Sequence, residues 1–270
     1  MRRLAVIAVT GLSLGVVCLS AAAVVTAQHW SQKDWDGLRT AFGGLDACKP
    51  VPGATATAID LAWTSDDDRL TISLPGEAHY QPGSGDRLSA RGDPNLLAHL
   101  RIRHHRVELD CNGGFRFGKL DVTLPGRAFR SFTVAGSGKL DLQQIDQPSL
   151  DLTIAGSGII KVNGKTDRLK AKIAGSGTID ASGQTDRVEL AIAGSGDAKF
   201  ARLVAKTADV NIAGSGDAEI APVDAADVKI AGSGDVRLFS EPKQLDTKIF
   251  GSGRILHGAA QREKADSDDN

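Results

Sequence analysis

The sequence predicts an all-β protein: a right-handed parallel β-solenoid (β-helix) of about seven rungs of 19 residues, preceded by a less regular β segment. A rung is one complete coil of the chain. Three observations predict this fold: a tetrapeptide recurs at near-constant spacing, apolar and polar residues alternate around it, and large aromatic side chains make up only 4% of the chain. The chain is therefore unlike an ordinary globule with an aromatic-rich core.

The repeat is Ala-Gly-Ser-Gly, and its seventh copy has Phe in place of Ala. Successive copies start 20, 19, 19, 20, 18 and 19 residues apart. Such self-similarity indicates stacked structural units. The copies start at Ala135, Ala155, Ala174, Ala193, Ala213, Ala231 and Phe250.

Between the copies, apolar and polar residues alternate with the period of two residues that is typical of β-strands. Around the fourth copy, Val188, Leu190 and Ile192 form one class and Glu189 and Ala191 the other, so one face is apolar. At about 3.3 Å per residue, one unit has a contour of about 60 Å, enough for three short sides and three corners. Parallel crossovers are nearly always right-handed, which predicts the hand of the coil.

Equivalent apolar residues of successive rungs are expected to stack in one column at the centre of the solenoid. An interior filled in this way leaves no room for a ligand, so any function lies on an outer face or at an end. The predicted core ladder is Val134, Ile154, Ile173, Ile192, Ile212, Ile230 and Ile249.

The two glycines of each Gly-Ser-Gly share the inward parity, which predicts a narrow corner where the backbone bends sharply. The alternative is a phosphate-binding loop, but such loops open helices and need a basic partner. The serines between the glycines are expected to form an outward hydroxyl column, and none has the neighbours of a nucleophile. They are Ser137, Ser157, Ser176, Ser195, Ser215, Ser233 and Ser252.

The third residue after each Gly-Ser-Gly alternates in charge from rung to rung. Opposite charges on neighbouring strands stabilise a sheet, whereas like charges repel, so this column is interpreted as a stabilising ladder that also fixes the register. The charged ladder is Asp141, Lys161, Asp180, Lys199, Glu219 and Arg237.

The neighbouring outward column ends in three stacked carboxylates, Asp197, Asp217 and Asp235. The alternatives are relief by Lys199 and Arg237 two residues away, or a calcium ion bridging the carboxylates. The first is favoured, so no metal, cofactor or catalytic residue is predicted, and the three aspartates stay as calcium candidates.

The chain begins with Arg2 and Arg3, followed by the uncharged stretch 4–27. This pattern is typical of a signal peptide, and its length also fits an uncleaved anchor, which would be the only contact with a membrane. Cys18 follows Val17, which is larger than the residue a lipid-attachment signal needs. The predicted organisation is a signal peptide or anchor at 1–27, a linker or cap at 28–57, irregular strands at 58–118, regular repeats at 119–257 and a charged tail at 258–270.

Cys48 and Cys111 are the two cysteines after the export segment. An oxidising compartment favours a disulfide between them, the alternative being two separate thiols.

Charged residues are balanced, with 32 Lys and Arg against 33 Asp and Glu, which disfavours nucleic acid as a partner.

A basic cluster in an alternating strand contains His99, His104 and His105, but adjacent histidines of a strand point to opposite faces and do not easily share an ion. Arg91-Gly92-Asp93 matches an integrin-binding tripeptide that arises readily by chance.

The repeated Gly-Ser-Gly, preceded by Leu120, Val122, Leu124 and Pro125 and then Phe132, resembles the auto-transporter adhesin head GIN domain of bacterial envelope proteins. The resemblance is strongest over 119–256 and looser over 59–118. It implies a right-handed solenoid outside the cytoplasm and brings no catalytic residues.

The sequence therefore predicts an exported, noncatalytic envelope scaffold or adhesin-like binding module, located in the periplasm, at the outer-membrane surface or outside the cell. The sequence does not identify the partner, for which an envelope protein and a polysaccharide are the candidates. The alternatives are a polysaccharide-active enzyme, which would need long loops over one face, and a calcium-binding surface repeat.

Overall fold

The structure is a computed structural model that describes residues 48–63, 68–83, 85–111, 119–126 and 129–258. The expected export segment 1–27, most of the linker 28–57 and nearly all of the tail 258–270 lie outside these residues. The described chain is nearly all strand, with one short helix. The all-β prediction is confirmed.

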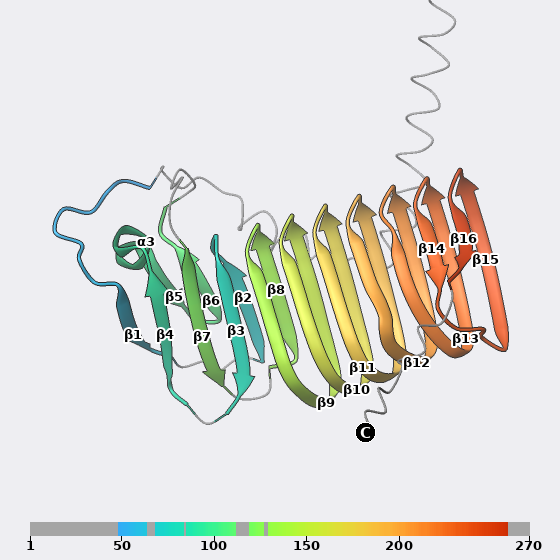
Figure 1. Cartoon of the computed structure of the whole chain (residues 1–270), viewed down its shortest axis with the longest axis horizontal. Helices are drawn as coiled ribbons and strands as arrows, with labels where there is room; N and C mark the ends of the chain where they lie inside the picture. The colour runs from blue at the N-terminus through green and yellow to red at the C-terminus, as the bar shows by residue number, and fades with distance from the viewer. Residues whose placement is uncertain (1–47, 64–67, 84, 112–118, 127–128, 259–270) are drawn as a thin grey trace, which may run out of the picture.

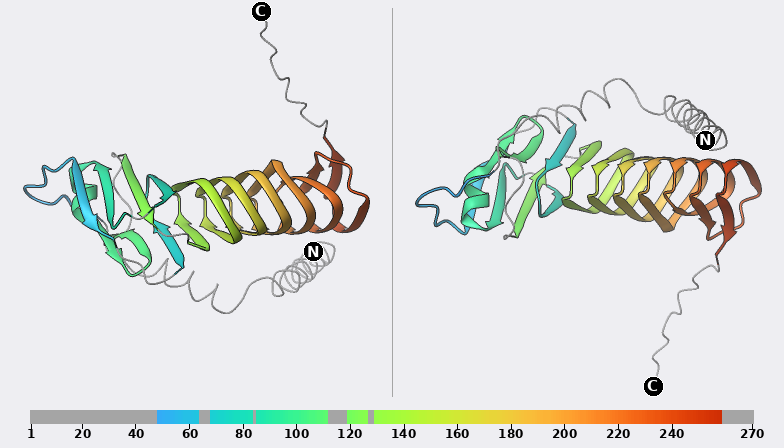
Figure 2. Two further views of the ribbon diagram at one scale, coloured as in Figure 1. Left: turned by 90° about the horizontal axis from the view of Figure 1, so that it is seen from below. Right: turned by 90° about the horizontal axis from the view of Figure 1, so that it is seen from above.

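The regular part is a parallel solenoid whose rungs lie side by side along the long axis of the molecule (Figures 1 and 2). Neighbouring rungs pair in parallel, residue by residue, at the spacing of the repeat, as in Ile173↔Ile192. The strands of the regular part are β8 (Ser131–Gly136), β9 (Lys139–Gly156), β10 (Ile159–Gly175), β11 (Thr178–Gly194), β12 (Asp197–Gly214), β13 (Ala218–Gly232), β14 (Asp235–Leu238), β15 (Gln244–Gly251) and β16 (Arg254–His257), of which β9 to β13 are long.

Each long strand bends on its way around the core, and the alternation of buried and exposed residues breaks at the bends. In β10 the adjacent Asp167 and Arg168 are both exposed, whereas residues before and after them alternate. The buried hydroxyl of Thr166 donates to the carbonyl of Arg168 at 3.1 Å, which satisfies a polar group at this corner. Thr185 makes the equivalent bond to Arg187 in the next rung at 3.2 Å.

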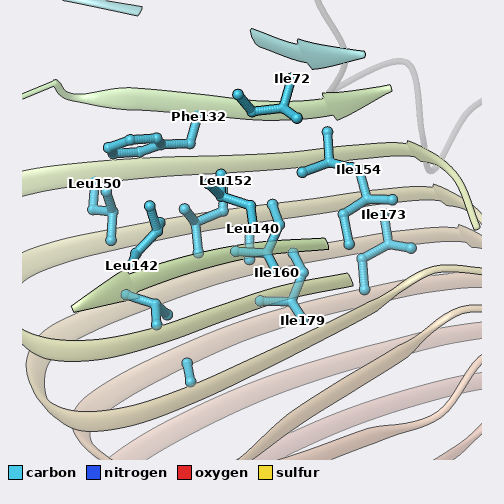
Figure 3. Packing of buried hydrophobic residues seen from close by; sticks show 14 of the residues in the cluster. Ile72, Phe132, Leu140, Leu142, Leu150, Leu152, Ile154, Ile160, Ile173 and Ile179 are labelled. Atoms are coloured by element: carbon cyan, nitrogen blue, oxygen red, sulfur yellow. The ribbon is translucent and has the colours of Figure 1, made fainter. Parts of the chain in front are cut away.

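The seven residues of the core ladder lie in one file, each paired with its equivalent in the next rung. Figure 3 shows Ile154 and Ile173 of this file. Ile72 of β2 (Arg69–Ser73) continues the file beyond Val134. Six of the seven are at most 1% exposed, while Ile249 in the last rung is 39% exposed. The interior is packed with aliphatic side chains, so ligands meet the molecule from outside.

The two glycines of a Gly-Ser-Gly have different roles, and the expected shared inward parity is wrong for the first of them. Gly194 is partly exposed with φ +127°, and a Cβ there would clash with the carbonyl oxygen of Gly175 in the preceding rung. Gly196 is buried, and a Cβ there would lie 2.5 Å from Cγ2 of Ile173. The positive φ of the first glycine interrupts the alternation and leaves Ser195 exposed, as expected for an outward hydroxyl.

The first rungs do not stack in chain order. The rung made by β2 and β3 lies between the rung of β6 and β7 and the rung of β8 and β9, because β2 pairs with both β6 and β8 and β3 pairs with both β7 and β9. The second coil of the chain, made by β6 and β7, therefore lies on the side of the first coil that faces away from the regular rungs. These strands are β2 (Arg69–Ser73), β3 (Glu77–Pro82), β6 (Arg106–Leu109) and β7 (Leu120–Gly126).

The N-terminal end is covered by antiparallel strands and the short helix. β4 (Arg87–Gly92) pairs antiparallel with β7, and β1 (Ala58–Ala62) pairs antiparallel with β4. The helix α3 (Pro94–His99) and β5 (Leu100–Arg103) fill the connection to β6.

An aromatic cluster closes the core beneath this cap. Phe129 packs edge-on against Trp63, Tyr80 and Phe132, with ring centroids 5.5–6.0 Å apart. All four rings are at most 3% exposed, so aromatic residues that are scarce in the repeats are concentrated where the regular rungs begin.

Candidate binding faces

All described strands belong to one continuous hydrogen-bonded sheet, and two parts of it are named by their place in the repeat. The leading sheet is formed by the segments that follow each Gly-Ser-Gly, up to β14 and β16, and the trailing sheet by the segments that precede each Gly-Ser-Gly, from β8 to β15.

The charged ladder runs in register along the leading sheet. Lys161 lies between Asp141 and Asp180, and the alternation continues to Glu219 and Arg237. The close ion pairs are made by arginines: Arg237 lies 3.7 Å from Glu219. Between Asp180 and Lys199, the guanidinium of Arg202 reaches Asp180 at 3.1 Å.

At the N-terminal end His79 continues the ladder. Its Nδ1 lies 3.9 Å from Asp141, and its Nε2 lies 3.6 Å from Asp121 and 3.8 Å from Glu77. Glu77 is also bound by Lys139 at 3.1 Å, which lowers the pKa of its carboxyl group. The resemblance and the repeats gave no reason to expect this group.

Hydrogen bonds relieve two of the three carboxylates in the acidic column, which is the stack of Asp197, Asp217 and Asp235. The carboxylate of Asp217 accepts the backbone N–H of Asp235 at 2.8 Å, and Asp235 accepts the backbone N–H of Arg254 at 3.0 Å. The Arg254 guanidinium also binds Asp235 at 2.6 Å and lowers the pKa of that carboxyl group. Both aspartates therefore join neighbouring rungs, and Arg254 rather than Lys199 or Arg237 makes the closest ion pair.

Two shallow hollows lie on the leading sheet. One, of about 230 Å³, is lined by the acidic column together with Lys199, Glu219 and Arg237. The other, of about 370 Å³, lies over β9–β12 and combines the charged ladder with the polar side chains Gln143, Asn163 and Ser182. Asn163 donates to Ser182 at 2.9 Å, so amide and hydroxyl groups line this hollow beside charges of both signs.

The trailing sheet carries a second acidic column that the sequence analysis missed. Glu189, Asp209, Asp227 and Asp246 stack in register in four successive rungs. Lys229 binds Asp227 at 2.9 Å, and Asn211 donates to Asp209 at 2.7 Å. These residues recur at the period of the repeat, so aligning the segment before each Gly-Ser-Gly would have found them.

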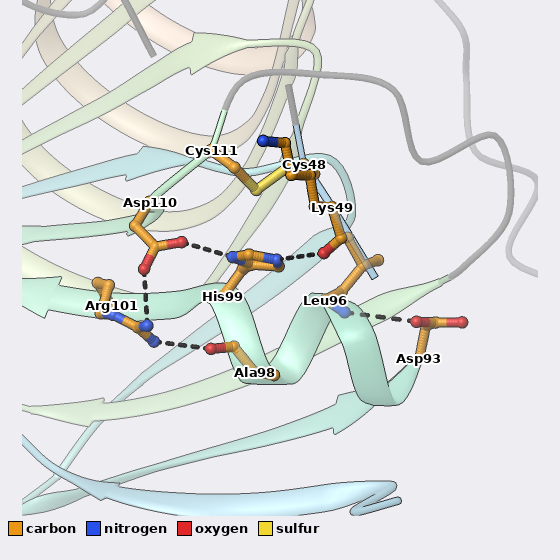
Figure 4. The surroundings of a disulfide bond; sticks show 9 residues. All are labelled: Cys48, Lys49, Asp93, Leu96, Ala98, His99, Arg101, Asp110 and Cys111. Atoms are coloured by element: carbon orange, nitrogen blue, oxygen red, sulfur yellow. Dashed lines mark hydrogen bonds and ion pairs between the residues drawn. A yellow bond between two sulfur atoms is a disulfide. The ribbon is translucent and has the colours of Figure 1, made fainter. Parts of the chain in front are cut away.

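Cys48 and Cys111, which are 63 positions apart in sequence, form a disulfide with Cα atoms 4.8 Å apart (Figure 4). Beside it, His99 bonds through Nδ1 to Asp110 at 2.6 Å and through Nε2 to the carbonyl of Lys49 at 2.8 Å. These bonds, that to Lys49 foremost, raise the pKa of His99. The disulfide and His99 together fasten the segment 48–49 to the cap.

In the described parts of the chain, the one convergent group of metal-ligand side chains is His99, Asp110 and Cys111, whose ligand atoms lie within 4.8 Å of one another. The sulfur of Cys111 is bonded to Cys48, and Asp110 is also held by Arg101 at 2.6 Å. The three aspartates predicted as calcium candidates do not form such a group.

The adjacent histidines and the Arg-Gly-Asp tripeptide both belong to local structural motifs. His104, with φ 53°, and His105 form the two-residue turn of the β5–β6 hairpin, so the expectation that they alternate within one strand is wrong. In the Arg-Gly-Asp tripeptide, Asp93 caps α3 by accepting the backbone N–H groups of Asn95 and Leu96.

The structure resembles several solved proteins. A putative adhesin from Bacteroides fragilis has a TM-score of 0.63 at 18% identity, over 74% of this chain and 96% of that chain. A putative lipid binding protein from Parabacteroides distasonis has a TM-score of 0.57 at 22% identity, again over 74% and 96%. A putative adhesin from Parabacteroides merdae has a TM-score of 0.55 at 16% identity, over 74% and 95%. At these identities the likeness shows the fold.

No match is found among curated proteins. Within the part of the chain that the structure describes, no helix has the length and apolarity needed to cross a membrane. The sequence matches the family described as "Putative auto-transporter adhesin, head GIN domain" over residues 68–242, from β2 into the last rungs. The protein is therefore a member of the auto-transporter adhesin head GIN domain family.

Proposed function

We propose that the protein is an exported, noncatalytic binding module of the cell envelope, and that the leading sheet holds an extended polymer, in the first place a polysaccharide. The observation that carries the proposal is the hollow of about 370 Å³ over β9–β12, where four successive rungs contribute amide, hydroxyl and charged side chains. An extended chain laid along the solenoid axis would meet a polar or charged side chain in each of these rungs.

The packed core supports binding on an outer face. Buried apolar residues fill the interior of the regular rungs as far as β14, so a polymer or a lipid would have to be held outside. The export pattern at 1–27 and the adhesin-like family support a location in the periplasm, at the outer-membrane surface or outside the cell. These two arguments point to a surface module.

The directions of the pKa shifts favour binding over acid–base catalysis. Asp235 and Glu77 have lowered pKa values because they accept hydrogen bonds from Arg254 and Lys139. Lys206 has a raised pKa because it binds Asp186. Ion-paired groups shift in this way, whereas a carboxyl group that acts as a general acid has a raised pKa.

The test is binding of the purified protein to polysaccharides extracted from its own envelope, measured by calorimetry. The variant Asn163→Ala with Arg202→Ala should weaken binding, because it removes an amide and a guanidinium from the hollow. The matched control Gln184→Ala with Lys206→Ala changes the same residue classes outside it, and should bind like the wild type. Equal binding by both variants, or no binding to any extract, would refute the proposed face.

Fractionation of cells tests the location separately. The protein is expected in the envelope or in the medium, and removal of 1–27 should retain it in the cytoplasm. Recovery of the full chain from the cytoplasm would contradict export.

A further inference from the structure

The two ends of the solenoid differ. Antiparallel strands and α3 cover the N-terminal end, whereas at the other end every residue of β15 is exposed. Leu245 is 37%, Ile249 39% and Phe250 68% exposed, although their equivalents in the preceding rung are buried or half-buried. Within the described residues β15 pairs on one side only, with β13. An unpaired edge of this kind is a template for another strand.

The residues of β15 fall into two sets by the face they occupy. Leu245, Thr247 and Ile249 continue the inward columns of buried Ala226, Val228 and Ile230. Asp246 and Lys248 continue the outward columns of Asp227 and Lys229. Within the solenoid, parallel pairing therefore already stacks Asp on Asp and Lys on Lys at this edge. A further parallel copy of the same strand would repeat these like-charge contacts.

Antiparallel self-pairing about a twofold axis reverses this relationship. Residues directly opposite each other in an antiparallel pair point to the same face of the sheet. In a symmetric pair of identical strands, one residue must therefore lie opposite its own copy, and the twofold axis passes between these two copies. An axis through Thr247 sets Asp246 opposite Lys248 of the second copy, twice, and sets Leu245 opposite Ile249 on the inward face. An axis through Asp246 or Lys248 would instead bring two like charges together.

We propose that two copies of this chain join end to end through antiparallel pairing of their β15 strands, with the twofold axis at Thr247. The contact extends the trailing sheet from one copy into the other. It covers the exposed ends of the apolar columns and doubles the length of the solenoid. The charges on β15 select this register, because it is the one that pairs Asp246 with Lys248.

A second copy fits this edge better than an unrelated strand, because the complementary sequence is already present in β15 itself. The contact involves one short strand from each copy with its neighbour β16, so it belongs to the class of small, weak interfaces. The dimer is therefore expected to dissociate on dilution.

Charge reversal tests the register. Sedimentation equilibrium of the purified protein, at concentrations up to the order of 1 mM, should show a monomer–dimer equilibrium. Asp246→Lys opposes Lys to Lys, and Lys248→Asp opposes Asp to Asp, so each variant should raise the dissociation constant at least about tenfold. The double variant restores opposite pairs and should dimerise like the wild type. Lys165→Asp, an exposed charge reversal in β10, is the control and should have no effect.

Mixing the two single variants gives a second readout. A chain with Lys at 246 and 248 faces a chain with Asp at both positions, so the mixture should form a heterodimer although each variant alone is a monomer. Monomeric wild type over the whole concentration range would overturn the proposal, and it is the result expected if another segment or another protein covers β15. A dimer that survives both single reversals would overturn it as well.

Discussion

Asp217 accepts a hydrogen bond at 2.8 Å from the backbone N–H of Asp235, one rung further along the solenoid. Asp235 makes the same contact with the backbone N–H of Arg254, so each of these two carboxylates binds the backbone of the next rung at the point where that rung begins. This contact gives Asp217 and Asp235 a structural role that needs no ion.

Asp217→Ala should destabilise the fold by about 1 kcal/mol, because the N–H of Asp235 loses its acceptor at a solvent-accessible site. Asp217→Asn retains an oxygen acceptor and should cost less. Urea unfolding of the three proteins measures the difference. The order Asn worse than Ala would contradict this role.

Calcium should leave the unfolding midpoint of the wild type unchanged relative to a chelator, because Asp217 and Asp235 already have hydrogen-bond partners. Calorimetric melting in calcium and in EDTA is the measurement. A calcium-dependent rise that disappears in Asp217→Asn would instead support the calcium site considered from the sequence.

Ile192→Ala should cost roughly 2 to 5 kcal/mol, because it opens a cavity between two packed rungs. Ile249→Ala is the matched variant: the same column and the same chemistry, but 39% exposed instead of 1%. It should cost clearly less. Equal losses in denaturant unfolding would mean that the last rung is covered in solution, as the proposed dimer requires at high concentration.

Gly194→Val should prevent folding or destabilise severely, since the positive φ and the carbonyl of Gly175 both exclude a side chain. Ser195→Val, one residue later, is exposed and should be nearly neutral. Circular dichroism melting of the two variants compares them directly. The reverse order of stability would show that the corner is assigned to the wrong residue.

The contribution of His99 to stability should depend on pH. Its pKa is raised above the ordinary 6.5, chiefly by the carbonyl of Lys49 and then by Asp110, so its stabilising effect is full below that value. It is lost as pH rises through the folded-state pKa. The difference in unfolding free energy between wild type and His99→Gln should therefore shrink from about pH 5 to about pH 9. A difference that grows with pH would reverse this assignment.

The regular rungs could be predicted because one period places both the Gly-Ser-Gly corners and the isoleucine column. The order of the first rungs could not, since β2 and β3 carry no repeat that says which strands flank them. The β5–β6 hairpin was missed for a related reason. Its turn residue with positive φ is His104, where glycine or asparagine is the usual signal.

The candidate faces were predicted in part. The charged ladder follows from spacing alone, because parallel in-register strands bring equivalent positions together. The pairing of Arg202 with Asp180 could not be foreseen, because it depends on a register shift between β11 and β12 that moves Arg202 opposite Ser182. The cluster around His79 likewise depends on the unexpected neighbours of β3.

The alternating signs of the charged ladder make two rungs, rather than one, the natural module of the molecule. Excising 176–194 would rejoin an intact Gly-Ser-Gly yet leave Lys161 beside Lys199, whereas excising 157–194 would set Asp141 beside Lys199. Deletion of an even number of rungs should therefore be tolerated better than deletion of an odd number, because only an even number keeps opposite charges next to each other in the ladder.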